Sequence, residues 1–253
     1  MRFSTSWLTN LSLDAPIVGT LWLALFGQVY RVPIHAVLLW LLFSGIWLIY
    51  VVDRLVEWDD ELMRERHTFH QHYRRFFIPI ALFVILLNGF LIWRYPLPHE
   101  FYGGAAIVAT GAAVYLGFSY LTADSSSKEW GKNILVSIIF SSGCTLPVWV
   151  TLIHRSRITL SFTLEFVSLT LLVFCNLRFI EAEETERRRF PVEIATAALL
   201  ILASTAIVCN RLTLVWLFSL LLMMGVRLSR LDRFSRTAYD IALIIPAAIM
   251  LVI

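Results

Sequence analysis

An acidic pair follows a long apolar run near the start of the chain, in the segment IYVVDRLVEWDDE. Asp53 and Glu57 are four residues apart, so on a helix both side chains project from the same face. Two carboxylates placed in this way can share a divalent cation, and magnesium prefers a few carboxylate oxygens together with water and substrate phosphate oxygens. The pair therefore suits metal-assisted binding of a phosphorylated lipid, although a solvated helix end at the membrane boundary would have the same pattern.

A second acidic segment, FCNLRFIEAEETERRR, closes another apolar run. Asn176 and Glu184 lie along one face of the expected helix, and Glu181 lies about one turn from Glu184. An Asn well inside an apolar helix is costly unless it faces protein, water or a ligand. We therefore expect Asn176 either to bind substrate or to form a hydrogen bond between helices. The surrounding acidic and basic residues are also compatible with a surface salt-bridge network.

Two basic segments could neutralise a bound diphosphate: RERHTFHQHYRR at 64–75 and SSSKEWGKN at 125–133. Arg and Lys side chains near a metal-bound diphosphate would stabilise its oxygens and assist departure of the leaving group. The first segment also contains three histidines, which could suggest zinc: His67, His70 and His72. No cysteine lies beside them and the setting is rich in arginine, so contact with phosphate or lipid headgroups is favoured over a zinc site.

The composition excludes an ordinary water-soluble domain. Of the 253 residues, 58% are hydrophobic and 15% are charged, and the mean hydropathy is +0.75. Apolar runs long enough to cross about 30 Å of hydrocarbon recur along the chain, and a helix that crosses this distance satisfies its own backbone polar groups. We therefore expect an all-α polytopic membrane protein, with residues 1–253 forming a single transmembrane domain.

Other classes of protein have little support in the sequence. The net charge of +3 does not suggest binding of nucleic acid. The N-terminal stretch lacks the compact apolar block of a secretory signal, so we expect the first spanning helix to direct insertion. The three cysteines lie singly in apolar runs, which favours core packing over disulfides or a zinc site: Cys144, Cys175 and Cys209.

Hydrophobic runs and their interruptions predict nine helices. Pro33 is placed to open the second helix, and Pro191 the seventh. The link around Asn210 is either a turn or a polar interruption of one longer segment. The predicted ranges are roughly 15–30, 33–58, 76–93, 102–122, 132–153, 159–182, 191–209, 212–228 and 238–253.

The distribution of basic residues predicts an orientation. Most Lys and Arg residues lie in the N-terminus or after the second, fourth, sixth and eighth predicted helices. Because cytoplasmic loops carry the excess of Lys and Arg, we expect the N-terminus to be cytoplasmic and, after nine crossings, the C-terminus to lie on the opposite side. A bacterial inner membrane is the expected location.

These segments together resemble the UbiA superfamily of intramembrane prenyltransferases. In that family a nine-helix bundle carries two Asp-rich motifs at the cytoplasmic ends of helices 2 and 6, which bind magnesium and an isoprenyl diphosphate. Here IYVVDRLVE lies over the first motif, and KEWGKNILVSIIFSSG resembles the loop between helices 4 and 5 and the start of helix 5. Ile49 and Tyr50 stand where the family usually has Asn and Asp, and the second motif, NLRFIEAEE, contains no Asp.

The resemblance implies a function and a set of site residues. An isoprenyl group would pass from its diphosphate to a lipophilic acceptor among the membrane lipids, with Mg²⁺ as cofactor. The catalytic residues would be Asp53, Glu57 and Glu184, and Glu181 would join these three as a metal ligand. The residues expected to bind the substrate are Tyr50, Arg54, Lys128, Lys132, Asn133 and Asn176, with Tyr50 placed to stabilise an allylic cation.

Two other functions fit the same sequence. A lipid-binding or scaffolding protein of the same fold could have lost the full metal site, as the altered motifs would suggest. An ion-coupled transporter would need ionisable residues near the middle of several helices. The sequence offers few of these, since Glu165 and Asp240 lie close to predicted helix ends.

Overall fold

The computed structural model describes residues 10–56, 65–121, 126–156, 159–184, 192–208, 210–228 and 235–252. Within these ranges all of the regular secondary structure is helical, as predicted. The helices are α2 (Asp14–Val29), α3 (Ala36–Val56), α4 (Glu65–His72), α5 (Arg74–Arg94), α6 (His99–Leu121), α7 (Ser126–His154), α8 (Leu160–Glu184), α9 (Val192–Ile207), α10 (Arg211–Leu228) and α11 (Ser235–Val252).

Each of the nine predicted helices coincides with a helix of the structure. The largest difference at a boundary is in α7, which begins at Ser126 rather than near residue 132. Hydropathy marks only the apolar part of a helix, and the first turns of α7 contain Lys and Glu, which are good helix formers. The short helix α4 was not predicted, because its polar sequence ERHTFHQH contains no apolar run.

Helices α9 and α10 are separate helices, and Asn210 caps the start of α10. The Asn210 side chain accepts a hydrogen bond from the backbone N–H of Thr213 at 3.2 Å, which is the arrangement of a helix N-cap. Asn210 therefore separates α9, which ends at Ile207, from α10, which begins at Arg211.

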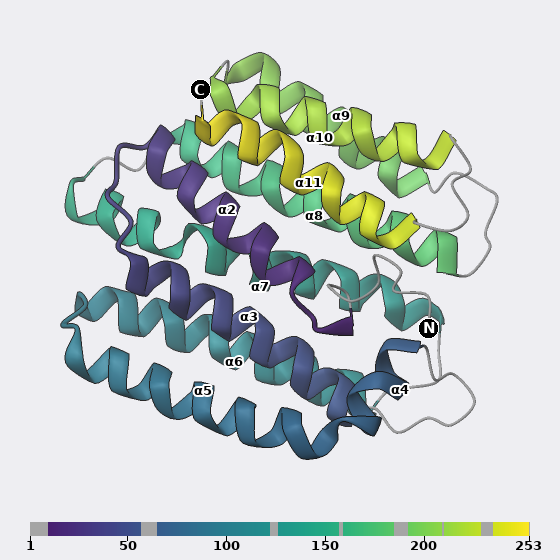
Figure 1. Cartoon of the computed structure of the whole chain (residues 1–253). Coiled ribbons are helices and arrows are strands. Elements are labelled where there is room, and N and C mark those ends of the chain that lie inside the picture. The colour runs from purple at the N-terminus through teal and green to yellow at the C-terminus, as the bar shows by residue number, and fades with distance from the viewer. Residues whose placement is uncertain are drawn as a thin grey trace.

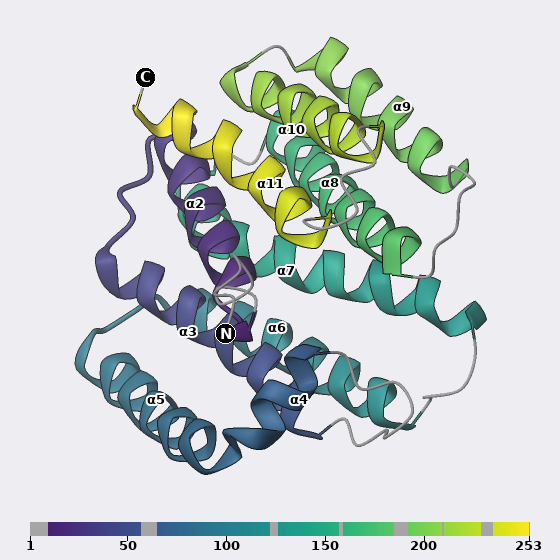
Figure 2. The ribbon, with the colours of Figure 1, turned by 45° about the vertical axis from the view of Figure 1, so that its right-hand side comes forward.

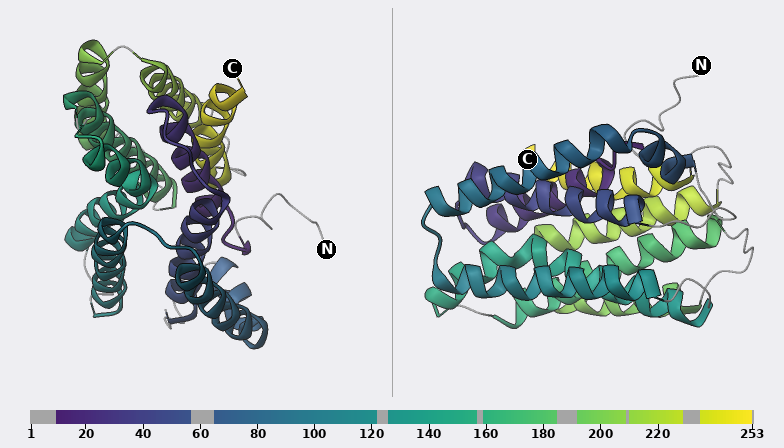
Figure 3. Two further views of the ribbon diagram at one scale, coloured as in Figure 1. Left: turned by 90° about the vertical axis from the view of Figure 1, so that its left-hand side faces the viewer. Right: turned by 90° about the horizontal axis from the view of Figure 1, so that it is seen from below.

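The helices run roughly side by side, with α2 and α7 packed against each other at the centre (Figures 1 and 2). On one side α3, α5 and α6 extend from this pair, and on the other side α8 to α11 form a second group (Figure 3). Helix α3 packs against α2, α4, α5, α6 and α7, whereas α8 packs against α7, α9, α10 and α11. We call the end of the bundle where α2 begins the Asp14 face and the end where α2 finishes the Tyr30 face.

The main apolar core lies between α2 and the second group of helices. Trp22 of α2 meets Trp216 of α10 edge to face, with ring centroids 6.2 Å apart, and both side chains are almost completely buried. Between α6 and α7 the helices approach closely at Gly104, where an added Cβ would lie 2.3 Å from Leu146 Cδ1. Small residues at such contacts let membrane helices pack at short range.

Five described helices are long and apolar enough to cross a membrane, judged by length and composition: Ala36–Leu55, Arg74–Arg94, Trp130–His154, Leu160–Ala182 and Arg211–Leu228. Three shorter apolar helices accompany them, at Asp14–Val29, Ile194–Ser204 and Thr237–Val252. Helix α5 exposes large apolar side chains, including Leu86 at 72% and Trp93 at 80%. These features support an integral membrane protein with at least part of the predicted set of spans.

Candidate functional site

The described residues of the predicted site lie toward the Asp14 face, on α3, α7 and α8. Glu57 lies outside the described residues, as do the side chains of Lys128 and Glu184. The distance between Asp53 and Glu184 is therefore still a matter of prediction. Helices α3 and α8 both flank the central α2 and α7 pair. The described hydrogen bonds form three groups around these helix ends.

The first group joins α7 to α8. Asn133 donates a hydrogen bond from Nδ2 to Oε2 of Glu181 at 2.7 Å. Arg178 donates from Nη1 to the same oxygen at 2.5 Å, one turn earlier on α8. The Arg178 and Glu181 side chains are only 10% and 16% exposed. Two predicted site residues, Asn133 and Glu181, are thus brought together, and the same Glu181 oxygen also binds Arg178, which was not predicted as a site residue.

The second group fixes the end of α3. Arg54 is 2% exposed, and its Nη1 donates a hydrogen bond to Ser12 Oγ at 2.5 Å. The Arg54 guanidinium also lies 5.9 Å from the centre of the Tyr50 ring. The Ser12 hydroxyl also hydrogen-bonds His70 Nε2 at 3.2 Å. From α4, Gln71 donates to the backbone carbonyls of Arg54 and Leu55, which belong to the last turn of α3. These contacts attach the segment before α2, together with α4, to the end of α3.

The third group lies deeper in the bundle, between α8 and α11. Asn176 donates from Nδ2 to Asp240 Oδ1 at 3.1 Å, and both side chains are buried. Phe179 stacks on Tyr239 nearby, with ring centroids 5.4 Å apart. The hydrogen bond between helices, one of the two roles expected for Asn176, is therefore present. Its predicted contact with substrate stays a prediction.

The metal ligands predicted from the sequence are only partly described. Among the described residues no three His, Cys, Asp or Glu side chains gather closely enough to hold a metal ion. Asp53 and Glu181 have the oxygen donors that magnesium prefers. Glu181 has a further role, because its Oε2 already accepts hydrogen bonds from Arg178 and Asn133. Of the three histidines, His70 is fully buried and its ring stacks on that of Phe77 with centroids 4.2 Å apart, which gives it a packing role.

A fourth polar cluster lies at the Tyr30 face. Glu165 of α8 is 2% exposed and accepts hydrogen bonds from the Tyr30 hydroxyl and from Asn210 Nδ2. This cluster joins the end of α2 to the starts of α8 and α10. At the same face Glu100 is exposed and pairs with His154. The pKa of the Glu100 carboxyl is lowered by a hydrogen bond to its own backbone and by the nearby His154 ring.

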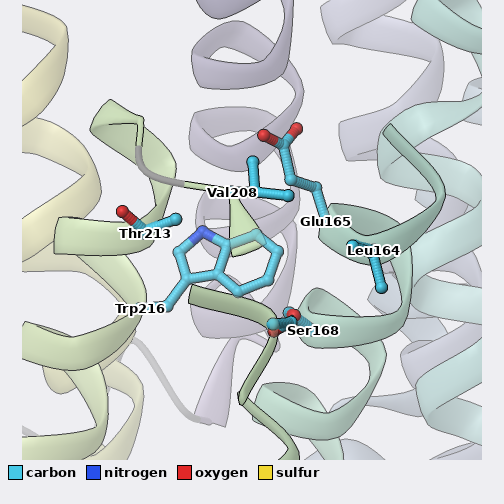
Figure 4. A pocket seen from close by; sticks show the side chains of 7 residues that line it. Leu164, Glu165, Ser168, Val208, Thr213 and Trp216 are labelled. Carbon is cyan, nitrogen blue, oxygen red and sulfur yellow. The ribbon is translucent and has the colours of Figure 1, made fainter. Parts of the chain in front are cut away.

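A small pocket adjoins Glu165 (Figure 4). It lies between α8, the end of α9 and α10, and Trp216 forms one wall, with its buried Nε1 lacking a hydrogen-bond partner. The lining residues are Leu164, Glu165, Ser168, Ser204, Val208, Thr213 and Trp216. The pocket is narrow and lies at the opposite end of the bundle from the predicted metal ligands, so it does not belong to their site.

Several residues of these clusters were not predicted as site residues, although some had a recognisable signal in the sequence. Arg178 precedes Glu181 by three residues, a spacing that places opposite charges side by side on a helix. Asp240 and Glu165 are carboxylates in apolar helices, which usually face the protein interior. Ser12 gives no signal in sequence, because its role depends on the path of the chain before α2.

The two described cysteines take no part in these polar clusters. Cys144 and Cys175 are both free thiols, and both are completely enclosed in the apolar core. Core packing is therefore confirmed for these two cysteines, whereas Cys209 lies outside the described residues.

Comparison of the chain with known proteins found no match. No family model, curated protein or solved structure matches the chain. A function is therefore inferred from the residues and contacts of the chain itself.

Proposed function

We propose that this chain is an intramembrane prenyltransferase of the UbiA type, which binds an isoprenyl diphosphate at its Asp14 face. The single observation that supports this most is the grouping of polar side chains at the ends of apolar helices. Asn133, Arg178 and Glu181 are linked there by hydrogen bonds, and Asp53 and Arg54 occupy the end of α3 at the same face. Such a face suits a ligand with a charged head and an apolar tail.

In this proposal each group has a distinct task. Asp53, Glu57 and Glu184 would hold Mg²⁺, which when bound would offset the negative charge of the diphosphate leaving group. Lys128 and Lys132, near the start of α7, would bind phosphate oxygens. Asn133 and Glu181 would set the spacing between α7 and α8. The apolar interior between helices would take the isoprenyl chain and keep water from the carbocation.

Transfer can be tested directly. The purified protein in nanodiscs would be incubated with radiolabelled isoprenyl diphosphates of several chain lengths, magnesium and a membrane lipid extract. We expect release of diphosphate together with a labelled lipophilic product, and loss of both in Asp53→Ala. Glu100→Ala is the matched control, since Glu100 is an exposed carboxylate on the Tyr30 face at the start of α6.

A second candidate is a lipid-binding protein without catalytic activity. The observation in its favour is that Arg54 and Glu181, both predicted to contact substrate or metal, make internal contacts that stabilise the helix ends. In the same assay this alternative predicts retention of the labelled diphosphate without release of the leaving group.

A further inference from the structure

Arg178 has an unusual environment for a permanent cation. It lies on α8 within about two turns of the helix end and is 8% exposed. Its Nη1 donates to Glu181, whereas its Nε is buried and has no hydrogen-bond partner. A buried N–H without an acceptor is costly, and more so on a charged group. The contact with Glu181 therefore leaves part of the guanidinium unsatisfied.

The unsatisfied atom indicates which kind of ligand would complete the site. Nε and the adjacent Nη2 form one edge of the guanidinium, and this edge matches two oxygens of a phosphate or carboxylate. Asn133, on the neighbouring α7, adds an amide, and Lys132 precedes it on the same helix. An oxyanion that enters from the Asp14 face would find a cation here. A ligand without an acceptor oxygen would leave Nε unpaired, and a neutral acceptor would leave the charge shared with Glu181 alone.

We infer that Arg178 binds the anionic head of the ligand through its Nε–Nη2 edge, while Glu181 holds the same guanidinium at Nη1. Only the identity of the anion as a diphosphate rests on the proposed function. In this arrangement the Glu181 carboxylate at Nη1 and the anion at the Nε–Nη2 edge repel each other and compete for the charge of one cation. Glu181 is then a positioning residue that sets the affinity for the anion, rather than a ligand of magnesium.

The competition predicts opposite effects on stability and on affinity. Glu181→Gln keeps the size of the side chain and an oxygen for Asn133, but removes the charge that opposes Arg178. The unliganded protein should lose stability, because a buried guanidinium is left without a counterion. The affinity for the anion should rise by about tenfold, since the competing carboxylate is gone and coupling of this kind is reciprocal.

Thermal unfolding in nanodiscs of zwitterionic lipid tests this inference. All measurements are made in EDTA, so that metal ligation does not contribute. The probes are a non-hydrolysable isoprenyl diphosphate analogue, inorganic diphosphate and the corresponding isoprenyl alcohol. Comparison of the first two probes distinguishes recognition of a lipid headgroup from recognition of free diphosphate. The alcohol is the control for binding of the isoprenyl chain without an anion. The variants are Glu181→Gln, Arg178→Gln and the charge-conserving Arg178→Lys.

Glu100→Gln is the matched control, because Glu100 also pairs with a basic side chain, His154 at 3.0 Å, but lies at the Tyr30 face. We expect Glu181→Gln to unfold at a lower temperature without ligand and to respond to about tenfold lower concentrations of the diphosphate analogue. Arg178→Gln should lose this response, Arg178→Lys should keep part of it, and the alcohol should affect all variants equally.

The inference is overturned if Glu181→Gln responds to the anion as the wild type does or more weakly. It is also overturned if neither diphosphate probe stabilises the wild type or Glu181→Gln. If inorganic diphosphate acts as strongly as the lipid analogue, the inference is supported with the headgroup alone as the recognised element. Failure of the proposed function gives a different result. If the anion still stabilises the protein but no isoprenyl group is transferred, the proposed function fails and this inference stands. If transfer occurs but Glu181→Gln does not bind the anion more tightly, this inference fails and the proposed function stands.

Discussion

Asn176 on α8 and Asp240 on α11 are joined by a buried hydrogen bond of 3.1 Å, which links two residues that are 64 positions apart in sequence. Polar contacts of this kind are among the specific interactions that hold membrane helices together, since lipid does not drive apolar helices to associate. The bond also gives Asn176 a structural role that can be separated from any contact with substrate.

Asn176→Ala should lower the free energy of unfolding by about 1 kcal/mol, because Asp240 loses a buried donor. The measurement is unfolding in mixed micelles, with a double-mutant cycle that includes Asp240→Ala. Thr170→Val is the control, since the described hydrogen bond of the Thr170 hydroxyl is to the carbonyl of Phe166 in its own helix. Additive effects of Asn176→Ala and Asp240→Ala would contradict a direct contribution of this bond.

Gly104 should tolerate a methyl group poorly. Its added Cβ would lie 2.3 Å from Leu146, whereas Gly103 has nothing within 4 Å. Gly104→Ala should therefore destabilise the protein by about 1 to 2 kcal/mol, and Leu146→Val should recover part of this loss. Gly103→Ala serves as the control and should be neutral or slightly stabilising, because Ala favours helix more than Gly does. Equal effects of the two glycine substitutions would refute the close contact between α6 and α7.

The Tyr30 hydroxyl should contribute to stability through its hydrogen bond to the buried Glu165 carboxylate. Tyr30→Phe removes this donor and should lower the free energy of unfolding by about 1 to 3 kcal/mol, because the acceptor stays buried. Unfolding in mixed micelles measures the loss. Tyr95→Phe is the control, since Tyr95 is also a tyrosine at a helix end but is 47% exposed. Similar small effects of the two substitutions would show that the Tyr30 hydroxyl has no such role.

The two ends of the chain should lie on opposite sides of the membrane, with the N-terminus cytoplasmic, if all nine predicted helices cross it. The N-cap at Asn210 supports separate α9 and α10 helices. Reporter fusions at each terminus measure the orientation. The same reporter behaviour at both ends would mean an even number of crossings.

Nine of the ten described helices could be predicted from the sequence because each of the nine contains a continuous apolar run, whereas the polar helix α4 has none. The polar contacts between them could not, because hydropathy does not show which helices are neighbours. Asn133 and Glu181 were each predicted, but their hydrogen bond depends on the packing of α7 against α8. Arg178 was left aside because an arginine near a helix end is ordinary in a membrane protein until its counterion is known.

The resemblance to a known family indicated which helix ends to examine, but not how their side chains pair. Arg54 was predicted to contact substrate, and its described contacts include Ser12 and Tyr50. The contact with Ser12 follows from the path of the chain before α2, which carries no apolar pattern. Glu165 and Tyr30 lie 135 residues apart, and only the fold brings them together.

Binding of an isoprenyl diphosphate together with magnesium at the Asp14 face can be measured through the thermal stability of the protein. A ligand that binds only the folded protein raises its apparent stability. We predict that a non-hydrolysable isoprenyl diphosphate analogue stabilises the wild type more with magnesium than without it. Asp53→Ala should lose the magnesium-dependent part, and Glu100→Ala should keep it. Absence of any magnesium-dependent stabilisation of the wild type, at every chain length tried, would contradict the account.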